Sequence, residues 1–278
     1  TSIKELAHRI SIISAERVRD EFTKILMSSN PRKGITLLVD TGLADLVLPE
    51  IPKLRLEVDE HHHHKDVYEH SITVLEQAIA HEERLGGPNL VIRLAALLHD
   101  IGKPKTRAFI EGGGVSFHHH EVVGARLAKK RLQALRFDND TIDAVELLTT
   151  LHLRFHGYGE GEWTDSAVRR YVRDAGEFIT HLHVLTRADC TTRNTTKAAR
   201  LAATYDSLEA RIAVLMEQEE LSKIRPDLDG EQVMQILNMK PSREVGQAMD
   251  FLLELRLEQG PIGAEAATKA LLEWWAKR

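Results

Sequence analysis

Apolar residues recur three and four positions apart along almost the whole chain, which is the spacing that places them on one face of an α-helix. No stretch alternates apolar and polar residues with the period of two that is typical of β-strands. The pattern therefore predicts an all-α protein. One or two helices are expected over residues 3–26, a long helix over 197–221, and shorter helices over 230–238, 241–258 and 264–277.

Glycine and proline residues divide these helices into three regions. They interrupt the chain repeatedly after residue 30, and a polar connection follows over residues 52–66. Five helical patterns with glycine-rich breaks then occupy residues 67–189. We predict an N-terminal helical region at residues 1–58, a central domain at 59–190 and a C-terminal helical region at 191–278. Because the first helix has no capping signal and no methionine precedes it, we expect the chain to be part of a longer protein.

The composition is close to that of an average soluble protein, with 42% hydrophobic and 28% charged residues. No segment approaches the roughly 18 unbroken apolar residues that a membrane span requires. Cys190 is the single cysteine, so no disulfide can form within the chain, and no secretory signal opens it. These features predict a cytoplasmic protein that has no membrane partner.

The formal net charge is −5, and the sequence contains no basic belt. Strong sequence-independent binding of nucleic acids relies on many Lys and Arg contacts to phosphate, so the overall charge makes the chain a poor candidate for it. The 15 histidines stand out instead, because a surplus of imidazoles favours metal coordination, although scattered surface histidines account for most of them. The run of histidines at residues 61–64 is interpreted as part of a loop.

A His-Asp pair ends the most apolar of the predicted helices. The segment Val91–Leu98 is interpreted as a helix buried on every side, and it runs into His99 and Asp100 before Gly102 ends it. The helix dipole presents negative charge at this end, so it repels the Asp100 carboxylate unless a cation lies beside it. An isolated His-Asp pair is more often an ordinary helix end with its carboxylate in water, so other residues must decide between the two interpretations.

Three other polar residues fall on apolar helix faces. Asp189 and His152 each continue a stripe of apolar residues at helical spacing, and His70 opens a helix whose inner face is apolar. Each of them alone could be a core residue with a satisfied hydrogen bond, and a buried carboxylate needs such a partner. Histidines and carboxylates that point inward from separate helices are, however, the way in which helical bundles build metal sites.

The order and spacing of these residues resemble those of the HD superfamily of phosphohydrolases. The resemblance lies in His70 of DVYEHS, in His99 and Asp100 of LLHDIGKP, and in Asp189 of LTRADCT. It implies a helical HD domain in which these four residues bind a divalent metal, and in which Asp100 also serves catalysis.

Three more residues are expected to serve the reaction. His120 in FHHHEVVGA and His152 in LTTLHLR are similar to two further histidines that some HD proteins use for a second metal or for the substrate phosphate. Lys103, one turn beyond Asp100, could neutralise charge that develops on a phosphate, and a solvated lysine at a helix end is the equal alternative.

The donor types of this site favour some metals over others. Imidazole and carboxylate together favour Mn, Fe, Co, Ni or Zn over Mg, which prefers oxygen ligands alone. Water bound to such an ion loses its proton near neutral pH, and the ion polarises a phosphoryl oxygen. The expected cofactor is therefore a divalent transition metal, and the expected substrate is a phosphoester or a nucleotide.

The resemblance extends beyond the HD domain. The segment RISIISAERVRDEFTKIL and the later LLVDTGLADLVLPEI are similar to the neck of bacterial CCA-adding tRNA nucleotidyltransferases and related poly(A) polymerases. The segment from Arg225 to Trp275 is similar to the tail of members that carry an HD domain. The resemblance implies that residues 1–58 are a helical neck, that residues 191–278 are a helical body and tail, and that tRNA is a partner of the whole protein.

One departure from that family limits the expected chemistry. The family's catalytic head carries a Gly-Ser motif followed by paired aspartates that hold magnesium, and this arrangement is not found in the 278 residues. We therefore expect no nucleotide addition by this chain, and the resemblance implies phosphatase, 2′-nucleotidase or 2′,3′-cyclic phosphodiesterase activity. The alternative is a catalytically idle pocket in a helical module that positions RNA, with a group of arginines near it: Arg154, Arg169, Arg170 and Arg173.

Overall fold

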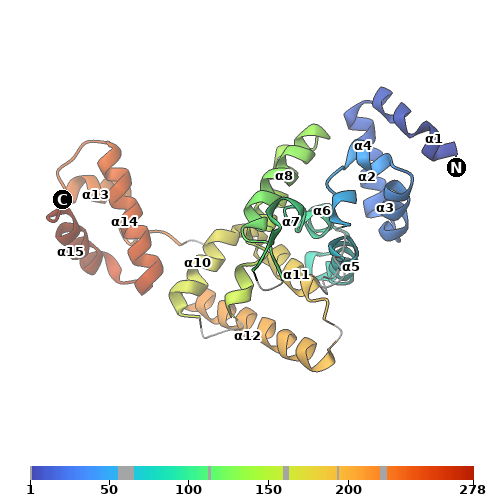
Figure 1. Cartoon of the computed structure of the whole chain (residues 1–278). Coiled ribbons are helices and arrows are strands. Elements are labelled where there is room, and N and C mark those ends of the chain that lie inside the picture. Colours follow the sequence, from blue (N-terminus) through green and yellow to red (C-terminus); the bar gives the residue numbers. More distant parts are fainter. Residues whose placement is uncertain (1, 56–65, 112–113, 159–162, 193, 220–223) are drawn as a thin grey trace. The chain divides into compact units, whose positions relative to one another are not determined.

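Helices form almost all of the regular structure in the computed structural model, which confirms the all-α prediction (Figure 1). The structure describes all residues except 1, 56–65, 112–113, 159–162, 193 and 220–223. The predicted boundary at residue 58 and the histidine run at residues 61–64 therefore lie outside the described residues, and the three predicted regions stay predictions. No helix of the described part is long and apolar enough to cross a membrane.

One small sheet, which the sequence pattern did not indicate, lies in the described part of the chain. Strands β1 (Ala108–Phe109) and β2 (Val115–Ser116) form an antiparallel hairpin in which Ala108 pairs with Ser116. Each strand has only two residues, which is too short to produce a recognisable alternation of apolar and polar positions. The hairpin does not change the fold class.

The chain forms two compact units. The first contains residues Thr1–Phe155 and Glu177–Ala202, and the second contains His156–Gly176 and Ala203–Arg278. Besides the hairpin, the elements that lie wholly within the first unit are α1 (Ser2–Leu6), η1 (Ala7–Ile12), α2 (Ala15–Met27), α3 (Pro31–Asp40), α4 (Leu43–Val47), η2 (Pro52–Leu54), α5 (Val67–Ala80), η3 (Glu82–Leu85), α6 (Leu90–Leu98), α7 (Lys103–Thr106), α8 (His120–Ala134), α9 (Asn139–Leu151) and α11 (Ile179–Asp189).

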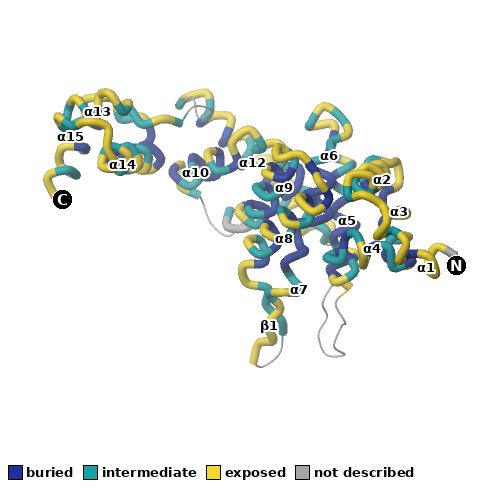
Figure 2. The backbone as a smooth tube through the Cα atoms, turned by 90° about the horizontal axis from the view of Figure 1, so that it is seen from above, coloured by how far each residue is buried: buried dark blue, intermediate teal, exposed yellow. Residues whose placement is uncertain are grey.

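Helix α6 is the central element of the first unit. The Asn89 side chain caps its first turn by accepting a hydrogen bond from the backbone N–H of Ile92. Every residue from Ile92 to Leu98 is buried, and α6 packs against α2, α5, α9 and α11 (Figure 2). A helix that is buried on all sides needs neighbours on all sides, and these four helices provide them.

Arg93 is a charged residue inside this buried helix, and the interpretation of Val91–Leu98 as apolar throughout overlooked it. Its side chain is only 5% exposed. The guanidinium donates two hydrogen bonds of 2.7 Å to the Glu82 carboxylate, and its third nitrogen donates to the backbone carbonyls of Leu26 and Ser28 at the end of α2. The buried charge is thus paired, and the same side chain satisfies carbonyls that the end of a helix leaves open.

The second unit repeats this arrangement with different residues. Its helices are α10 (Asp165–Ala175), the part of α12 (Thr195–Glu219) from Ala203 onward, α13 (Gly230–Ile236), α14 (Arg243–Gln259) and α15 (Gly263–Trp275). Arg169 pairs with Glu219 at 2.7 and 2.8 Å and donates to the carbonyl of Leu257 near the end of α14. Helices α13, α14 and α15 enclose a small apolar core of their own, which includes Val233, Leu252 and Leu271.

Candidate metal centre

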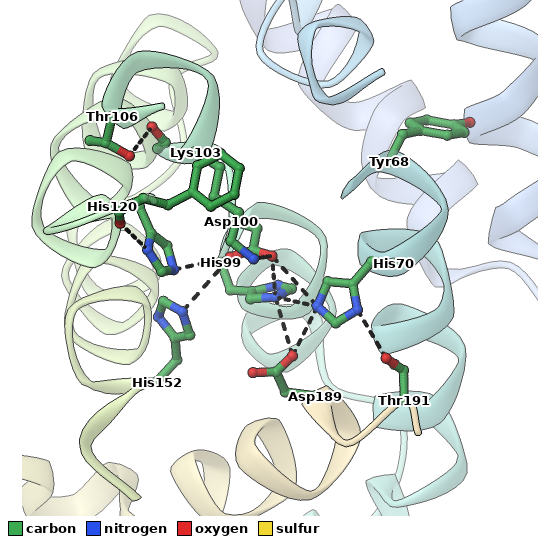
Figure 3. A network of polar contacts seen from close by, with 12 residues as sticks. Tyr68, His70, His99, Asp100, Lys103, Thr106, His120, His152, Asp189 and Thr191 are labelled. Atoms are coloured by element: carbon green, nitrogen blue, oxygen red, sulfur yellow. Dashed lines mark hydrogen bonds and ion pairs between the residues drawn. The ribbon is translucent and has the colours of Figure 1, made fainter. Parts of the chain in front are cut away.

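Six histidine and aspartate side chains meet inside the first unit, and each lies at or near the end of a helix (Figure 3). They are His70 in the first turn of α5, His99 and Asp100 directly after α6, His120 at the start of α8, His152 directly after α9, and Asp189 at the end of α11. The structure thus brings together all the residues that the sequence analysis named as metal ligands, and the two additional histidines with them.

The first group surrounds the Oδ2 atom of Asp100 (Figure 3). This atom lies 3.5 Å from His70 Nε2 and 3.3 Å from His99 Nε2. The Oδ1 atom of Asp189 lies 2.9 Å and 3.6 Å from the same two nitrogens. One ligand atom each from His70, His99 and Asp100 lie within 4.8 Å of one another, so these residues could hold a metal ion.

The second group lies on the other side of the same carboxylate. The Oδ1 atom of Asp100 is 3.2 Å from His120 Nε2 and 3.9 Å from His152 Nε2. Asp100, His120 and His152 also satisfy the spacing of a possible metal site, and all three are buried. Asp100 therefore belongs to both groups, with one oxygen facing each of them.

The backbone fixes the orientation of three of the four imidazoles. The Nδ1 atoms of His99, His120 and His152 lie 2.9, 2.8 and 2.7 Å from the carbonyl oxygens of Ala96, Phe117 and Thr149, each three residues earlier in the chain. Because a carbonyl can only accept, each Nδ1 atom must carry the hydrogen. The Nε2 atoms therefore face the Asp100 carboxylate with a lone pair when the ring is neutral, as in metal sites where the second nitrogen is held by a backbone carbonyl.

His70 is oriented by a residue that the sequence analysis missed. Its Nδ1 atom lies 3.2 Å from the hydroxyl of Thr191, which follows Asp189 by two residues. Its Nε2 atom lies 3.3 Å from His99 Nε2. Two neutral imidazoles that point lone pairs at each other repel, so a proton or another cation must lie between them.

The residues of this centre fit a bound cation. The Nε2 atoms of His120 and His152 are buried and have no hydrogen-bond partner among the described residues, although His120 Nε2 is close to Asp100. A buried polar atom without a partner costs about 1–3 kcal/mol. The lone pairs of these two Nε2 atoms accept no hydrogen bond from the described residues, and they lie next to the Asp100 carboxylate, which is 1% exposed. A metal ion would be coordinated by such nitrogen and oxygen atoms.

The charges in the centre shift the pKa of several groups. Burial acts to raise the pKa of Asp100, but His99, His120 and Lys103 outweigh it and hold that pKa well below its usual value. Asp189 has a lowered pKa for the same reason, with burial opposed by His70 and His99. Burial and the charge of His99 lower the pKa of His152 to about 3. Both carboxylates are therefore ionised and His152 is neutral at pH 7, which is the state in which such groups bind metals.

Lys103 lies at the edge of the centre, at the start of α7. Its Nζ atom is 2.6 Å from Asp100 Oδ2, and its side chain is 21% exposed whereas that of Asp100 is 1% exposed. The lysine thus places a positive charge between the buried carboxylate and the surface. A charge in this position can also reach an anionic ligand.

A close approach of two backbones sets the distance between α7 and α8. A Cβ atom on Gly102 would lie 2.7 Å from the backbone nitrogen of Gly124 and would overlap the carbonyl of His120. Only glycine at residue 102 allows α8 to begin this close to Asp100. The sequence marks Gly102 as the end of a helix, but it does not indicate that this glycine also determines the position of His120.

Two protein families match parts of the chain. Residues 67–216 match the HD domain family. Residues 1–54 match a family described as "Probable RNA and SrmB- binding site of polymerase A". The HD match contains all six residues of the centre.

Two curated relatives are similar over almost the whole chain, and others match about half of it. The A-adding tRNA nucleotidyltransferase of Deinococcus radiodurans is 32% identical over 98% of this chain, and the CC-adding tRNA nucleotidyltransferase of Thermus thermophilus is 34% identical over 97% of it. The chain covers 61% and 58% of the length of these two relatives. A multifunctional CCA protein of Neisseria meningitidis is 35% identical over 52% of the chain and 34% of its own length.

The family assignment rests on these matches together with the arrangement of the centre. The HD match covers more than half of the chain, and it includes the H, HD and D residues in their order. The chain belongs to the HD domain family, among relatives that are tRNA nucleotidyltransferases.

Proposed function

We propose that the HD domain of this chain is a metal-dependent phosphohydrolase of the 2′,3′-cyclic phosphodiesterase, 2′-nucleotidase or phosphatase type. The convergence of four imidazole Nε2 atoms on one buried aspartate, with two of those atoms lacking a partner, supports this proposal most directly. Structural histidines in a protein core normally have a hydrogen-bond partner for each buried nitrogen. A ligand-binding role explains the exception.

His70, His99, Asp100 and Asp189 are the proposed ligands of the first ion. Their mixture of imidazole nitrogens and carboxylate oxygens favours Mn, Fe, Co, Ni or Zn over Mg. Such an ion, when bound, lowers the pKa of water and polarises a phosphoryl oxygen. Thr191 and the Ala96 carbonyl hold the distal nitrogens of His70 and His99, so they keep the donor atoms aimed at the ion.

His120 and His152 are proposed to act on the opposite side of Asp100. They either bind a second ion or hold the substrate phosphate, and both possibilities use their Nε2 atoms. The lowered pKa of His152 keeps its imidazole neutral at pH 7. A neutral imidazole can bind a second ion directly, because no proton has to leave Nε2 first. A phosphate would instead need a proton on Nε2, since an imidazole lone pair repels an anion.

Lys103 is proposed to stabilise negative charge on the phosphate. It already pairs with Asp100 at the edge of the centre, and its side chain is partly exposed. When Asp100 binds a cation, the lysine is available to an incoming anion, and charge stabilisation of this type acts most strongly where water is excluded. The lysine therefore has a positioning role for Asp100 as well as a direct one for the substrate.

The whole protein is proposed to act in tRNA processing in the cytoplasm. Its curated relatives are an A-adding and a CC-adding tRNA nucleotidyltransferase, so we infer that tRNA is its partner. Cys190 is a free cysteine in the described structure, which suits a reducing compartment. The HD domain would then hydrolyse a phosphate ester at or near an RNA end.

The decisive experiment measures metal content and hydrolysis in the same preparations. The chain is purified without chelator, loaded separately with Mn, Co, Ni, Zn or Mg ions, and assayed with adenosine 2′,3′-cyclic phosphate, adenosine 2′-phosphate and p-nitrophenyl phosphate. We expect hydrolysis with at least one transition metal and a loss of about a hundredfold or more in Asp100→Asn. The control Asp143→Asn, at an exposed position of α9, should keep full activity.

A wild-type chain that binds no metal and hydrolyses none of these substrates would support the alternative of an idle pocket in an RNA-positioning module. Three of the four arginines that were expected to serve that role form ion pairs within the second unit. Arg169 pairs with Glu219, and Arg170 and Arg173 pair with Glu254 of α14. Their charges are therefore already compensated within the second unit, which weakens the alternative.

A further inference from the structure

One cavity of the first unit has a lining that contains none of the six residues of the metal centre. It has a volume of about 320 Å³ and is bounded by η2, α7 and α8. This volume falls at the lower end of the roughly 300–1,000 Å³ that is typical of ligand pockets.

Positively charged side chains dominate the polar part of the lining. They are Lys53 from η2, Lys105 from α7, and Lys130 and Arg131 from α8. The Arg131 guanidinium makes two hydrogen bonds to the Glu50 carboxylate, at 2.8 and 3.0 Å, so its charge is compensated.

The three lysines have no such compensation. All three are exposed, and none has an ion-pair partner among the residues that the structure describes. The neighbouring Lys129 shows the contrast, because it pairs with Glu146 at 2.6 Å. Three like charges around one cavity repel one another, and the repulsion is relieved when an anion enters.

The rest of the lining is apolar. Ile101, Pro104, Leu127 and Ala134 contribute to it. A cavity lined by apolar side chains together with exposed lysines fits a ligand that carries both an apolar part and phosphate groups, which is the chemistry of a nucleotide unit.

We propose that this cavity binds the phosphate groups of a single-stranded RNA segment, with Lys53, Lys105 and Lys130 as the contacting cations. Glu50 and Lys53 belong to the region that matches the RNA-binding family, and the remaining lining residues belong to the HD match, so the cavity lies where the two matched regions meet. A strand held there contacts α7, the helix that begins with Lys103. The net charge of −5 gives the chain no general attraction for RNA, so binding depends on this local group of lysines.

The test measures binding of a short fluorescent single-stranded RNA by fluorescence anisotropy at several salt concentrations, with EDTA present so that no metal contributes. The wild-type chain is compared with the triple variant Lys53→Gln/Lys105→Gln/Lys130→Gln. Each phosphate contact to a single strand contributes about 0.7 to the steepness of log K against log salt concentration. The slope of the triple variant should therefore be less steep than that of the wild-type chain by about 2. Its affinity should fall in the same way for RNAs of different sequence.

The matched control is Lys197→Gln/Lys240→Gln/Lys269→Gln, which removes three exposed lysines outside both the cavity and the region that matches the RNA-binding family, and which changes the net charge equally. It should leave the slope unchanged. An equal loss in both triple variants, or no loss in either, would overturn the proposal. Because EDTA removes metal, neither result depends on the hydrolytic activity proposed above.

Two further arms complete the design. Inorganic phosphate and adenosine 5′-monophosphate are added as competitors, and displacement of RNA by the mononucleotide at equal phosphate concentration would assign the cavity to a free nucleotide instead. Circular dichroism verifies that the variants keep their helices. If the triple variant does not fold, the three single variants provide the same test, each with an expected loss of about 0.7 in slope.

Discussion

Asp100 faces both groups of histidines, because its two carboxylate oxygens point to opposite sides of the centre. Its position directly after α6 exposes it to the negative end of the helix dipole, and its side chain is buried. Both effects act against a carboxylate, and the surrounding imidazoles and Lys103 offset them. The two groups should therefore respond differently when their own histidines are removed.

At the residue scale, His120→Ala and His99→Ala should have distinguishable effects on metal content. His120 belongs to the second group only, so its removal should reduce turnover while at least one metal equivalent per chain stays bound. His99 belongs to the first group, and its removal should abolish metal binding by that group. Metal analysis after gel filtration tests both variants. Complete loss of metal in His120→Ala would mean that this histidine belongs to the primary ligand set.

His152 gives the metal-free protein a specific dependence on pH. Its pKa in the folded chain is about 3, below its ordinary value of 6.5, because of burial and the charge of His99. Between these values the unfolded chain takes up a proton that the folded chain refuses, so stability that is present above pH 6.5 is lost as the pH falls. Between about pH 7.5 and pH 5 the loss amounts to about 2 kcal/mol.

Urea unfolding of the chelator-treated protein measures this effect, with His152→Gln as the reference. The difference in free energy of unfolding between the two proteins should shift by about 2 kcal/mol over that range, in favour of the variant at the lower pH. His99 has a raised pKa and acts in the opposite direction, but it is present in both proteins. Parallel pH profiles would show that His152 is not held neutral.

At the scale of elements, the contact between α7 and α8 controls the second half of the centre. Gly102 precedes α7, and Gly124 lies one turn into α8. The two backbones are so close that no side chain fits between them. Because His120 is the first residue of α8, any movement of this helix changes its distance from Asp100.

Gly102→Ala should therefore destabilise the protein by about 1–3 kcal/mol, as overpacking of a tight contact does, and should weaken metal binding by the second group. Thermal unfolding and metal titration measure the two effects. Gly246→Ala on α14 is the control, because a Cβ atom there meets nothing within 4 Å. Alanine at that position should leave stability unchanged or increase it by up to about 1 kcal/mol. Equal effects of the two substitutions would contradict the role of the close contact.

The elements were predictable from the sequence to a large extent because helical periodicity is a local property. The apolar stripes that lead to His152 and Asp189 predicted that both residues lie on the inner faces of their helices, and in the structure their side chains are 1% and 16% exposed, at the ends of α9 and α11. Arg93 was overlooked because one charge within a strongly apolar run does not change the average pattern, although it changes the packing. The site distances were not predictable, because they depend on contacts between helices that are far apart in the sequence.

Thr191 and the Gly102–Gly124 contact illustrate this limit. Thr191 is one of several threonines after α11, and nothing in its sequence neighbourhood marks it as the partner of His70. The glycines are readily recognised as helix breakers, but the sequence does not state which backbone approaches them. The set of candidate ligands came from the resemblance to the HD superfamily, whereas their orientation comes from backbone carbonyls that only the fold brings into position.

At the scale of the whole molecule, the 278-residue chain should hydrolyse a 2′,3′-cyclic or 2′-phosphate but should not incorporate labelled CTP or ATP into tRNA. Nucleotide transfer needs carboxylates that hold two magnesium ions beside a nucleotide-binding motif, and the Gly-Ser motif with its paired aspartates is not found in this sequence. A complete tRNA nucleotidyltransferase assayed in parallel is the positive control. Incorporation of nucleotides by this chain would contradict the expectation that these 278 residues contain no site for nucleotide transfer.

The buried pair of Arg93 and Glu82 has a consequence for dividing the chain into fragments. The Arg93 side chain ends on carbonyls of α2, so an HD domain transplanted without that helix would carry a buried cation that has lost two of its acceptors. A fragment of this chain that begins between α2 and α6 should therefore be less stable than one that begins at or before Ala15, and urea unfolding would measure the difference. The HD match begins at residue 67, so a fragment cut at that position would contain the buried cation of Arg93 but not the backbone carbonyls of α2 that accept its hydrogen bonds.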